Sequence, residues 1–149
     1  MNKIEKLSKE QFAEETSVIY LKVFQEIDKL FDKYTKIDSE FEKEIDELHK
    51  RSVEQMIEYG KVLAKKEEET KSDFITSCLL DNMTAMEKLG TEVSDGYEKK
   101  LDQRLPELQA YGSANLERKF DELYSIMDFL DLETLKEERP ESAKEFGIQ

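Results

Sequence analysis

Apolar residues recur at helical spacing along the first half of the chain, in steps of three and four. The repeat runs through Ile27, Leu30, Tyr34, Ile37, Phe41, Ile45, Leu48, Met56, Tyr59 and Leu63. Residues 8–69 contain no proline and only one glycine, Gly60. Ser8 and Gln11 have the spacing of a capping box at the start of this stretch. The pattern predicts one continuous helix over 8–69, on the order of 90 Å long at about 1.5 Å per residue.

The apolar face of this predicted helix is broad near its start and narrow further along. Residues 18–31 carry nine apolar side chains, more than the seam of a two-stranded coiled coil needs. Such a face requires at least two neighbouring helices. From 37 to 56 the face narrows to a two-stranded seam flanked by charged residues. We therefore expect a protruding coiled-coil arm with a broad apolar base.

A second helix is predicted over 72–104, after a run of polar residues. Ser72 is a suitable N-cap, and the apolar repeat resumes directly after it. Gly90 and Gly96 lie near this repeat, where they favour either a bend or the close approach of another helix. The interruption by two glycines argues against an extended fibrous coiled coil.

Pro106 divides the second half of the chain. Because proline disfavours helical geometry in the residue before it, we expect the second helix to end near residue 104 or to kink there. A third helical segment is predicted over 106–137, with Ser113 as a possible internal cap and another broad apolar face. Residues 138–149 are expected to form a short helical turn or a frayed tail.

The predicted fold class is all-α, in a single domain spanning 1–149. The two halves would pair as a long antiparallel helical hairpin or coiled coil, with the third C-terminal segment at one end. Two helices cannot bury apolar faces this broad, so the apolar end should form a three- or four-helix bundle. Either the segment 106–137 folds back as a third helix, or two chains join there. We favour a homodimer.

Composition narrows the possible partners and compartments. The chain has 149 residues and a formal net charge of −13, which repels nucleic acids and anionic membranes. We therefore expect no direct binding to nucleic acid or membrane. The single cysteine cannot form an internal disulfide, and no signal peptide or membrane span is evident. The expected compartment is the cytoplasm, while export without a cleavable signal stays open.

Few residues in the sequence suggest chemistry. His49 is the only histidine, and Asp46 precedes it by one helical turn, as in di-metal helical bundles. A second such pair is missing, so we expect His49 to face solvent or a neighbouring helix rather than to bind metal or accept a phosphoryl group. Cys78 lies among apolar residues and should be a buried structural thiol. We expect a protein that is not an enzyme and that uses no metal or cofactor.

Acidic residues cluster in two places. Residues 121–145 carry nine acidic side chains against three basic ones, and residues 38–47 carry six against one. A solvated helix face is one interpretation, and a docking surface for a basic partner is the other. In the C-terminal cluster the acids alternate with apolar side chains, which suits a partner that is basic or has an apolar helix. The partner-binding residues that we predict are Asp121, Glu122, Tyr124, Asp128, Phe129, Asp131, Leu132, Glu133 and Leu135.

The sequence favours a non-enzymatic helical module for protein–protein interaction, such as an adaptor, a chaperone or an inhibitor. Two alternatives stay open. One is a structural coiled-coil dimer whose interface uses all the surplus apolar surface. The other is an acidic nucleic-acid mimic that inhibits a nucleic-acid-binding enzyme.

Overall fold

The computed structural model describes residues 7–70, 74–89 and 91–148, and within those ranges it contains helices and no strand. The prediction of an all-α helical bundle is therefore confirmed. The elements are α1 (Lys9–Lys33), α2 (Ser39–Thr70), α3 (Phe74–Leu89), α4 (Thr91–Tyr111), α5 (Ala114–Tyr124), the 3-10 helix η2 (Ile126–Leu130), α6 (Leu132–Glu138) and α7 (Pro140–Glu145). The capping box at the start of α1 is also confirmed, with Ser8 and Gln11 bonded to each other's backbone N–H groups at 2.9 and 3.2 Å.

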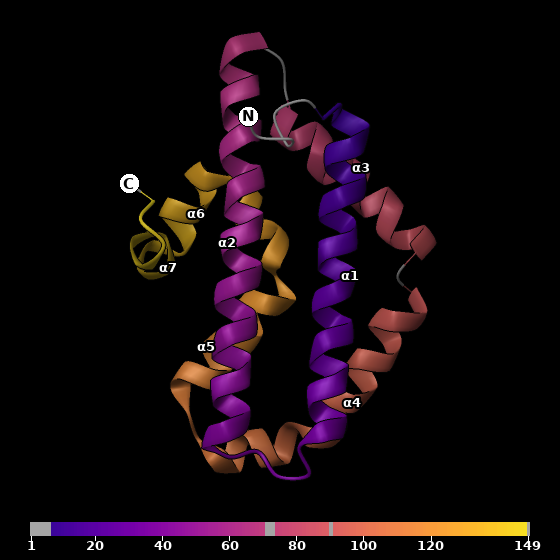
Figure 1. Ribbon diagram of the computed structural model, residues 1–149, viewed down its shortest axis with the longest axis vertical. Coiled ribbons are helices and arrows are strands. Elements are labelled where there is room, and N and C mark those ends of the chain that lie inside the picture. The colour runs from indigo at the N-terminus through magenta and orange to yellow at the C-terminus, as the bar shows by residue number, and fades with distance from the viewer. Residues whose placement is uncertain (1–6, 71–73, 90, 149) are drawn as a thin grey trace.

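The prediction of one continuous helix over 8–69 is wrong. The chain leaves the helical conformation at Tyr34 and starts α2 at Ser39. Asp38 explains the new start, because its carboxylate accepts the backbone N–H groups of Glu40 and Phe41 at 3.1 and 3.0 Å. The reversal makes α1 and α2 a short antiparallel hairpin (Figure 1).

Aromatic packing accompanies this reversal. The ring of Phe31, before the turn, stacks on that of Phe41, after it, with centroids 5.7 Å apart. Phe120 of α5 lies against both rings, at 5.8 and 6.1 Å. A straight rod would hold Phe31 and Phe41 about 15 Å apart along its axis, so only the folded hairpin can bury them together.

The predicted second helix is two helices, α3 and α4, and its expected end near residue 104 is wrong. The helix α4 continues through Pro106 to Tyr111. The side chain of Arg104 donates to the backbone carbonyls of Phe31 and Tyr34 at 2.9 and 3.0 Å. These bonds cap the end of α1 and hold the turn of α4 that precedes the proline, whose own ring is exposed. The expected cap Ser72 and Gly90 lie outside the described residues.

The third predicted segment is confirmed as helical but is divided. It comprises α5, η2 and α6, and α7 follows where a turn or tail was expected. Ser113 caps α5 as predicted, since its hydroxyl oxygen accepts the Leu116 N–H at 3.1 Å. The preceding residue, Gly112, has a φ of 68°, a left-handed conformation that ends α4.

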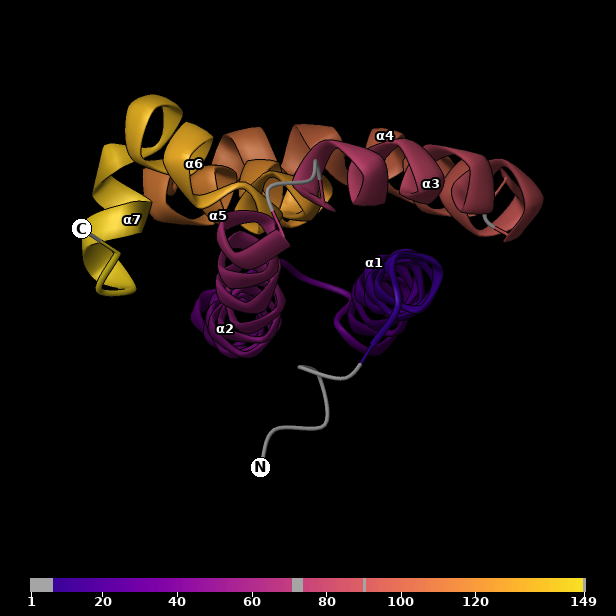
Figure 2. The ribbon, with the colours of Figure 1, turned by 90° about the horizontal axis from the view of Figure 1, so that it is seen from above.

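The helices form two layers. The antiparallel pair α1 and α2 makes one layer, and α3, α4, α5 and α6 lie across one face of it (Figures 1 and 2). The core fills the space between the layers. Among the described residues, its largest fully buried side chains are Phe12, Phe24, Phe41, Phe129, Ile27, Ile45, Met56, Leu63, Leu116, Leu123 and Ile126.

The burial of these side chains bears on two expectations, the protruding coiled-coil arm and the homodimer. The predicted coiled-coil arm over 37–56 does not protrude, because Phe41, Ile45 and Met56 are fully buried within the two layers. The broad apolar faces are covered by other helices of the same chain, so their burial needs no second copy. The homodimer stays a prediction. Among the described helices, none combines the length and the apolar character that crossing a membrane requires.

Candidate functional site

The structure separates the nine predicted partner-binding residues into several groups. Phe129, Leu135 and Glu122 retain only 0%, 1% and 2% exposure. Phe129 and Leu135 belong to the core, and the Glu122 carboxylate bonds to groups inside the protein. These three side chains therefore do not form part of the surface.

Three of the predicted acids have structural partners. Asp121 and Asp128 both form ion pairs with Arg139, at 3.0 and 3.3 Å. Asp131 caps α6, because its carboxylate accepts the backbone N–H and the hydroxyl of Thr134 at 3.3 and 2.9 Å. The local negative charge is thus partly balanced within the C-terminal segment.

The remaining three predicted residues are at least partly accessible. Tyr124 is exposed and donates a hydrogen bond to Glu98 at 3.1 Å. Glu133 pairs with Lys136 at 3.1 Å, and Leu132 is half-buried. The C-terminal cluster therefore offers a smaller accessible surface than its sequence suggested.

His49 is fully buried, so the expectation of a solvent-facing histidine is wrong and that of a helix-pairing one fits. Its Nε2 lies 2.6 Å from Oε1 of Glu122 on α5. The other carboxylate oxygen of Glu122 accepts the hydroxyl of Ser142 on α7. Burial alone would raise the pKa of Glu122, but the hydrogen bonds from His49 and Ser142, with the charge of Arg118, outweigh it and lower that pKa. The three side chains join α2, α5 and α7.

This cluster has the residue types of a hydrolase triad in the wrong arrangement. In a triad the histidine lies between the nucleophile and the carboxylate, whereas here Glu122 lies between Ser142 and His49. Ser142 therefore lacks the histidine base of a triad, and its side chain is itself buried. His49 Nδ1 is buried without a hydrogen-bond partner in the described part of the chain, next to the ring of Phe146. No group of three potential metal ligands occurs among the described residues.

The buried position of Cys78 is confirmed, and burial raises the pKa of its thiol to about 11. Its neighbour on α3, Asn82, is a buried polar residue that the sequence analysis missed. The Asn82 amide donates at 2.7 to 2.8 Å to the Ala13 carbonyl and to the hydroxyls of Thr16 and Ser17 on α1. Asn82 therefore holds α3 against α1, and the buried Cys78 thiol is not accessible.

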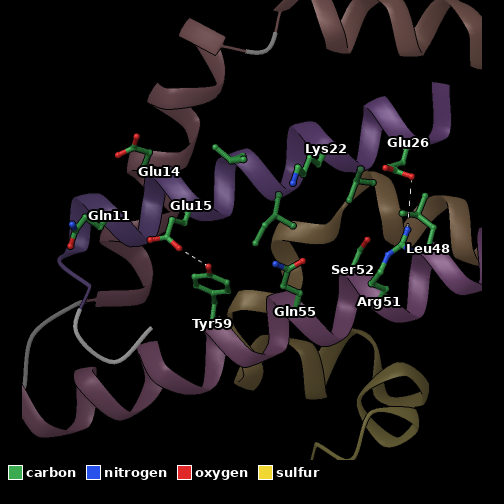
Figure 3. Close-up of a pocket in the computed structure, with 13 residues that line it drawn as sticks. Gln11, Glu14, Glu15, Lys22, Glu26, Leu48, Arg51, Ser52, Gln55 and Tyr59 are labelled. Carbon is green, nitrogen blue, oxygen red and sulfur yellow. Dashed lines mark hydrogen bonds and ion pairs between the residues drawn. The ribbon is translucent and has the colours of Figure 1, made fainter. Parts of the chain in front are cut away.

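A cleft lies between α1 and α2 and is referred to below as the α1–α2 cleft. It has a volume of about 660 Å³, within the usual range for ligand-binding sites. Figure 3 shows side chains from both helices pointing into it. The cleft is lined by Gln11, Glu14, Glu15, Val18, Ile19, Lys22, Val23, Glu26, Leu48, Arg51, Ser52, Gln55 and Tyr59.

Two interactions cross the α1–α2 cleft. At one end the Tyr59 hydroxyl donates to the Glu15 carboxylate at 2.8 Å, and burial together with this bond raises the pKa of Tyr59. At the other end Arg51 lies 3.9 Å from Glu26, in an exposed ion pair (Figure 3). The nearly buried side chains of Ile19 and Val23, between these crossings on α1, and of Leu48, one turn before Arg51 on α2, give the cleft an apolar floor.

The sequence held a partial signal for this site. The surplus apolar width of residues 18–31 indicated that this part of α1 meets more than one neighbour. The contribution of α2 to the cleft could not be predicted, because a continuous helix would place residues 48–59 far from residues 15–26. Only the turn at 34–38 brings the two stretches side by side.

Comparison with known proteins adds no assignment. The chain matches no protein family, no curated protein and no solved structure at a significant level.

Proposed function

We propose that this protein is a non-enzymatic interaction module that binds an amphipathic helix of another protein in the α1–α2 cleft. The observation that carries the proposal is the cleft itself, which has an apolar floor and polar walls. All of its lining residues belong to α1 and α2, and α3 to α6 lie across one face of this pair (Figure 2). An apolar helix was among the partners that the sequence suggested.

The shape of the site favours a helix as the bound element. Two antiparallel helices leave a groove along their length, and a third helix packs into such a groove through its own ridge of side chains. The crossings at Glu15 and Glu26 are separated by eleven residues of α1. At about 1.5 Å per residue this is about 16 Å, or three turns of a bound helix.

The histidine and the cysteine, which are the side chains most often used in catalysis, lie in the protein interior. His49 and Cys78 are both fully buried, and neither lines the α1–α2 cleft. The groups in the cleft are carboxylates, amides, a lysine, an arginine, a serine and a tyrosine, without a histidine or cysteine near them. This composition suits recognition better than nucleophilic chemistry.

Charge indicates the general character of the partner. The net charge of −13 attracts a positively charged segment over long range and would make association faster at low salt. Glu14, which lines the α1 side of the cleft, has no ion-pair partner among the described residues. Basic residues on the flanks of a bound helix would face it.

The test uses a phage-displayed library of 18-residue amphipathic helices selected against the intact protein. We expect helices that bind the wild type and bind Val18→Glu at least tenfold more weakly, measured by fluorescence anisotropy. Val18 lines the cleft and is 44% exposed, so the substitution should leave the fold intact. A tenfold loss corresponds to about 1.4 kcal/mol.

Leu80→Glu is the matched control. Leu80 is a large apolar residue on α3, 59% exposed and away from the cleft, and the substitution adds the same charge. We expect it to leave the affinity unchanged. The proposal is wrong if no helix is enriched, or if the enriched helices bind Val18→Glu as tightly as the wild type.

A further inference from the structure

Besides Glu14, three polar side chains that line the α1–α2 cleft have no partner among the described residues, namely the exposed Lys22 and Gln55 and the nearly buried Ser52. Figure 3 shows Ser52 and Gln55 pointing from α2 into the space between the helices, with Lys22 opposite them on α1. The three groups lie between the two crossings described above.

Ser52 is the most informative of these side chains. Its residue is only 5% exposed, yet its hydroxyl bonds to no other described group. A helical serine can bond back to the carbonyl of the preceding turn, as Thr16 does to Phe12 at 2.7 Å. The Ser52 hydroxyl instead points into the cleft (Figure 3). The hydroxyl thus faces the open space of the cleft, where a group of a bound partner can accept or donate a hydrogen bond.

The chemistry of the three groups indicates an anion. A lysine ammonium can only donate hydrogen bonds, while a serine hydroxyl can donate one and a glutamine amide two. Of the three acids that line the cleft, Glu15 accepts from Tyr59 and Glu26 pairs with Arg51, while Glu14 lies beyond the Glu15 crossing along α1. A carboxylate placed among the three donor groups would accept charge-assisted hydrogen bonds in a half-enclosed site.

We propose that the helix bound in the α1–α2 cleft carries one aspartate or glutamate in the middle of its apolar face, bound by Lys22, Ser52 and Gln55. This inference rests on the proposed function and specifies the partner. The apolar residues three and four positions on either side of the acid would pack on Ile19, Val23 and Leu48. The partner is therefore a helix with basic flanks, an apolar stripe and a single acid at its centre.

The experiment randomises the central position of the library helices and compares the selected residues. On the wild type we expect enrichment of Asp and Glu at that position. On Lys22→Glu we expect the preference to reverse to Lys and Arg. On Ser52→Ala we expect the acidic helices to bind about tenfold more weakly, because a hydrogen bond to a charged group is lost. Thermal unfolding of each variant verifies that the fold is intact.

Lys29→Glu is the control for general electrostatics. Lys29 is exposed on the same helix and does not line the cleft. We expect Lys29→Glu to retain the preference for an acidic centre, and a reversal in this variant would contradict the inference.

The failure of this inference differs from that of the proposed function. If the enriched helices are sensitive to Val18→Glu but accept leucine or glutamine at the centre as readily as glutamate, the central acid is wrong and the helix-binding cleft stands. If no helix is enriched at all, both fail together.

Discussion

At the scale of single residues, Gly60 shows how closely α2 packs on the second layer. Its backbone conformation is ordinary helix, so the requirement for glycine is one of space. A Cβ atom at this position would lie 2.8 Å from the carbonyl oxygen of Leu130 and 3.0 Å from that of Phe129. These are backbone atoms of η2, and they cannot rotate away as a side chain could.

Gly60→Ala is therefore expected to destabilise the protein. Alanine is favoured over glycine within a helix by about 1 kcal/mol. The overlap with η2 costs about 1–3 kcal/mol and should outweigh that gain. We expect a net fall of about 1 kcal/mol in the free energy of unfolding, measured by urea denaturation.

Glu58→Ala, at an exposed site on the same helix, serves as the control and should change stability by less than about 0.5 kcal/mol. A Gly60→Ala variant more stable than the wild type would show that η2 can move away from α2 at little cost.

At the scale of elements, the turn between α1 and α2 decides the architecture. Asp38 begins α2 by accepting two backbone N–H groups, and Arg104 caps the carbonyl end of α1. The helix ends on both sides of the turn are therefore satisfied by side chains. Without these partners the exposed backbone groups would favour continuing the helix.

Asp38→Ala should weaken this turn. Loss of an N-cap typically lowers stability by about 1 kcal/mol, whereas Asp38→Asn keeps an oxygen acceptor and should cost less. Urea denaturation of the two variants provides the measurement. Equal stability of the alanine variant and the wild type would mean that the Phe31–Phe41 stack alone holds the hairpin.

At the scale of the whole molecule, the cluster around Glu122 links the C-terminal segment to the hairpin. Its carboxylate joins α2 through His49 and α7 through Ser142, and Arg118 and Arg139 lie 3.7 and 3.8 Å away. The pKa of Glu122 is lower in the folded protein than its ordinary value. The unfolded chain therefore binds the proton more readily than the folded one.

This difference predicts a loss of stability in acid. The contribution of ionised Glu122 is fully present above its unfolded pKa, near the ordinary value of 4.5, and is lost as the pH falls through the lower folded pKa. We expect Glu122→Gln to lower the free energy of unfolding by about 2 kcal/mol at pH 7 and to flatten its dependence on pH below 4.5. Urea denaturation between pH 7 and pH 3 measures both effects.

Glu117→Gln provides the comparison, because Glu117 is exposed on the same helix. It should retain the stability of the wild type at pH 7 and its decline in acid. A Glu122→Gln variant with an unchanged pH profile would contradict the role of this carboxylate.

Much of the local structure could be predicted from the sequence. Helical periodicity, the capping box at Ser8 and the cap at Ser113 depend on residues within one or two turns of each other, so they can be recognised without knowing the fold. The burial of Cys78 also followed from its apolar neighbours. In contrast, the same periodicity predicts a rod through 34–38, because the apolar repeat includes Tyr34 and Ile37, which lie within the real turn.

The candidate site depended on long-range packing. The partner of His49 is Glu122, seventy-three residues away, and no pattern in the sequence connects them. The acids at Asp121 and Asp128 suggested a docking surface until the position of Arg139 was known. The two walls of the α1–α2 cleft come from opposite sides of the turn, so neither stretch alone suggests a cleft.

The sequence by itself determined that this chain is helical, acidic and amphipathic, because these properties depend on residue type and short-range spacing. The tertiary structure alone decided where the first helix reverses, which carboxylates are buried and which face of the hairpin stays open. Those outcomes depend on contacts between residues far apart in the chain, such as Arg104 with the end of α1 and Phe120 with Phe31 and Phe41. The free energy of such contacts outweighs local helical preference, and local patterns do not reveal it.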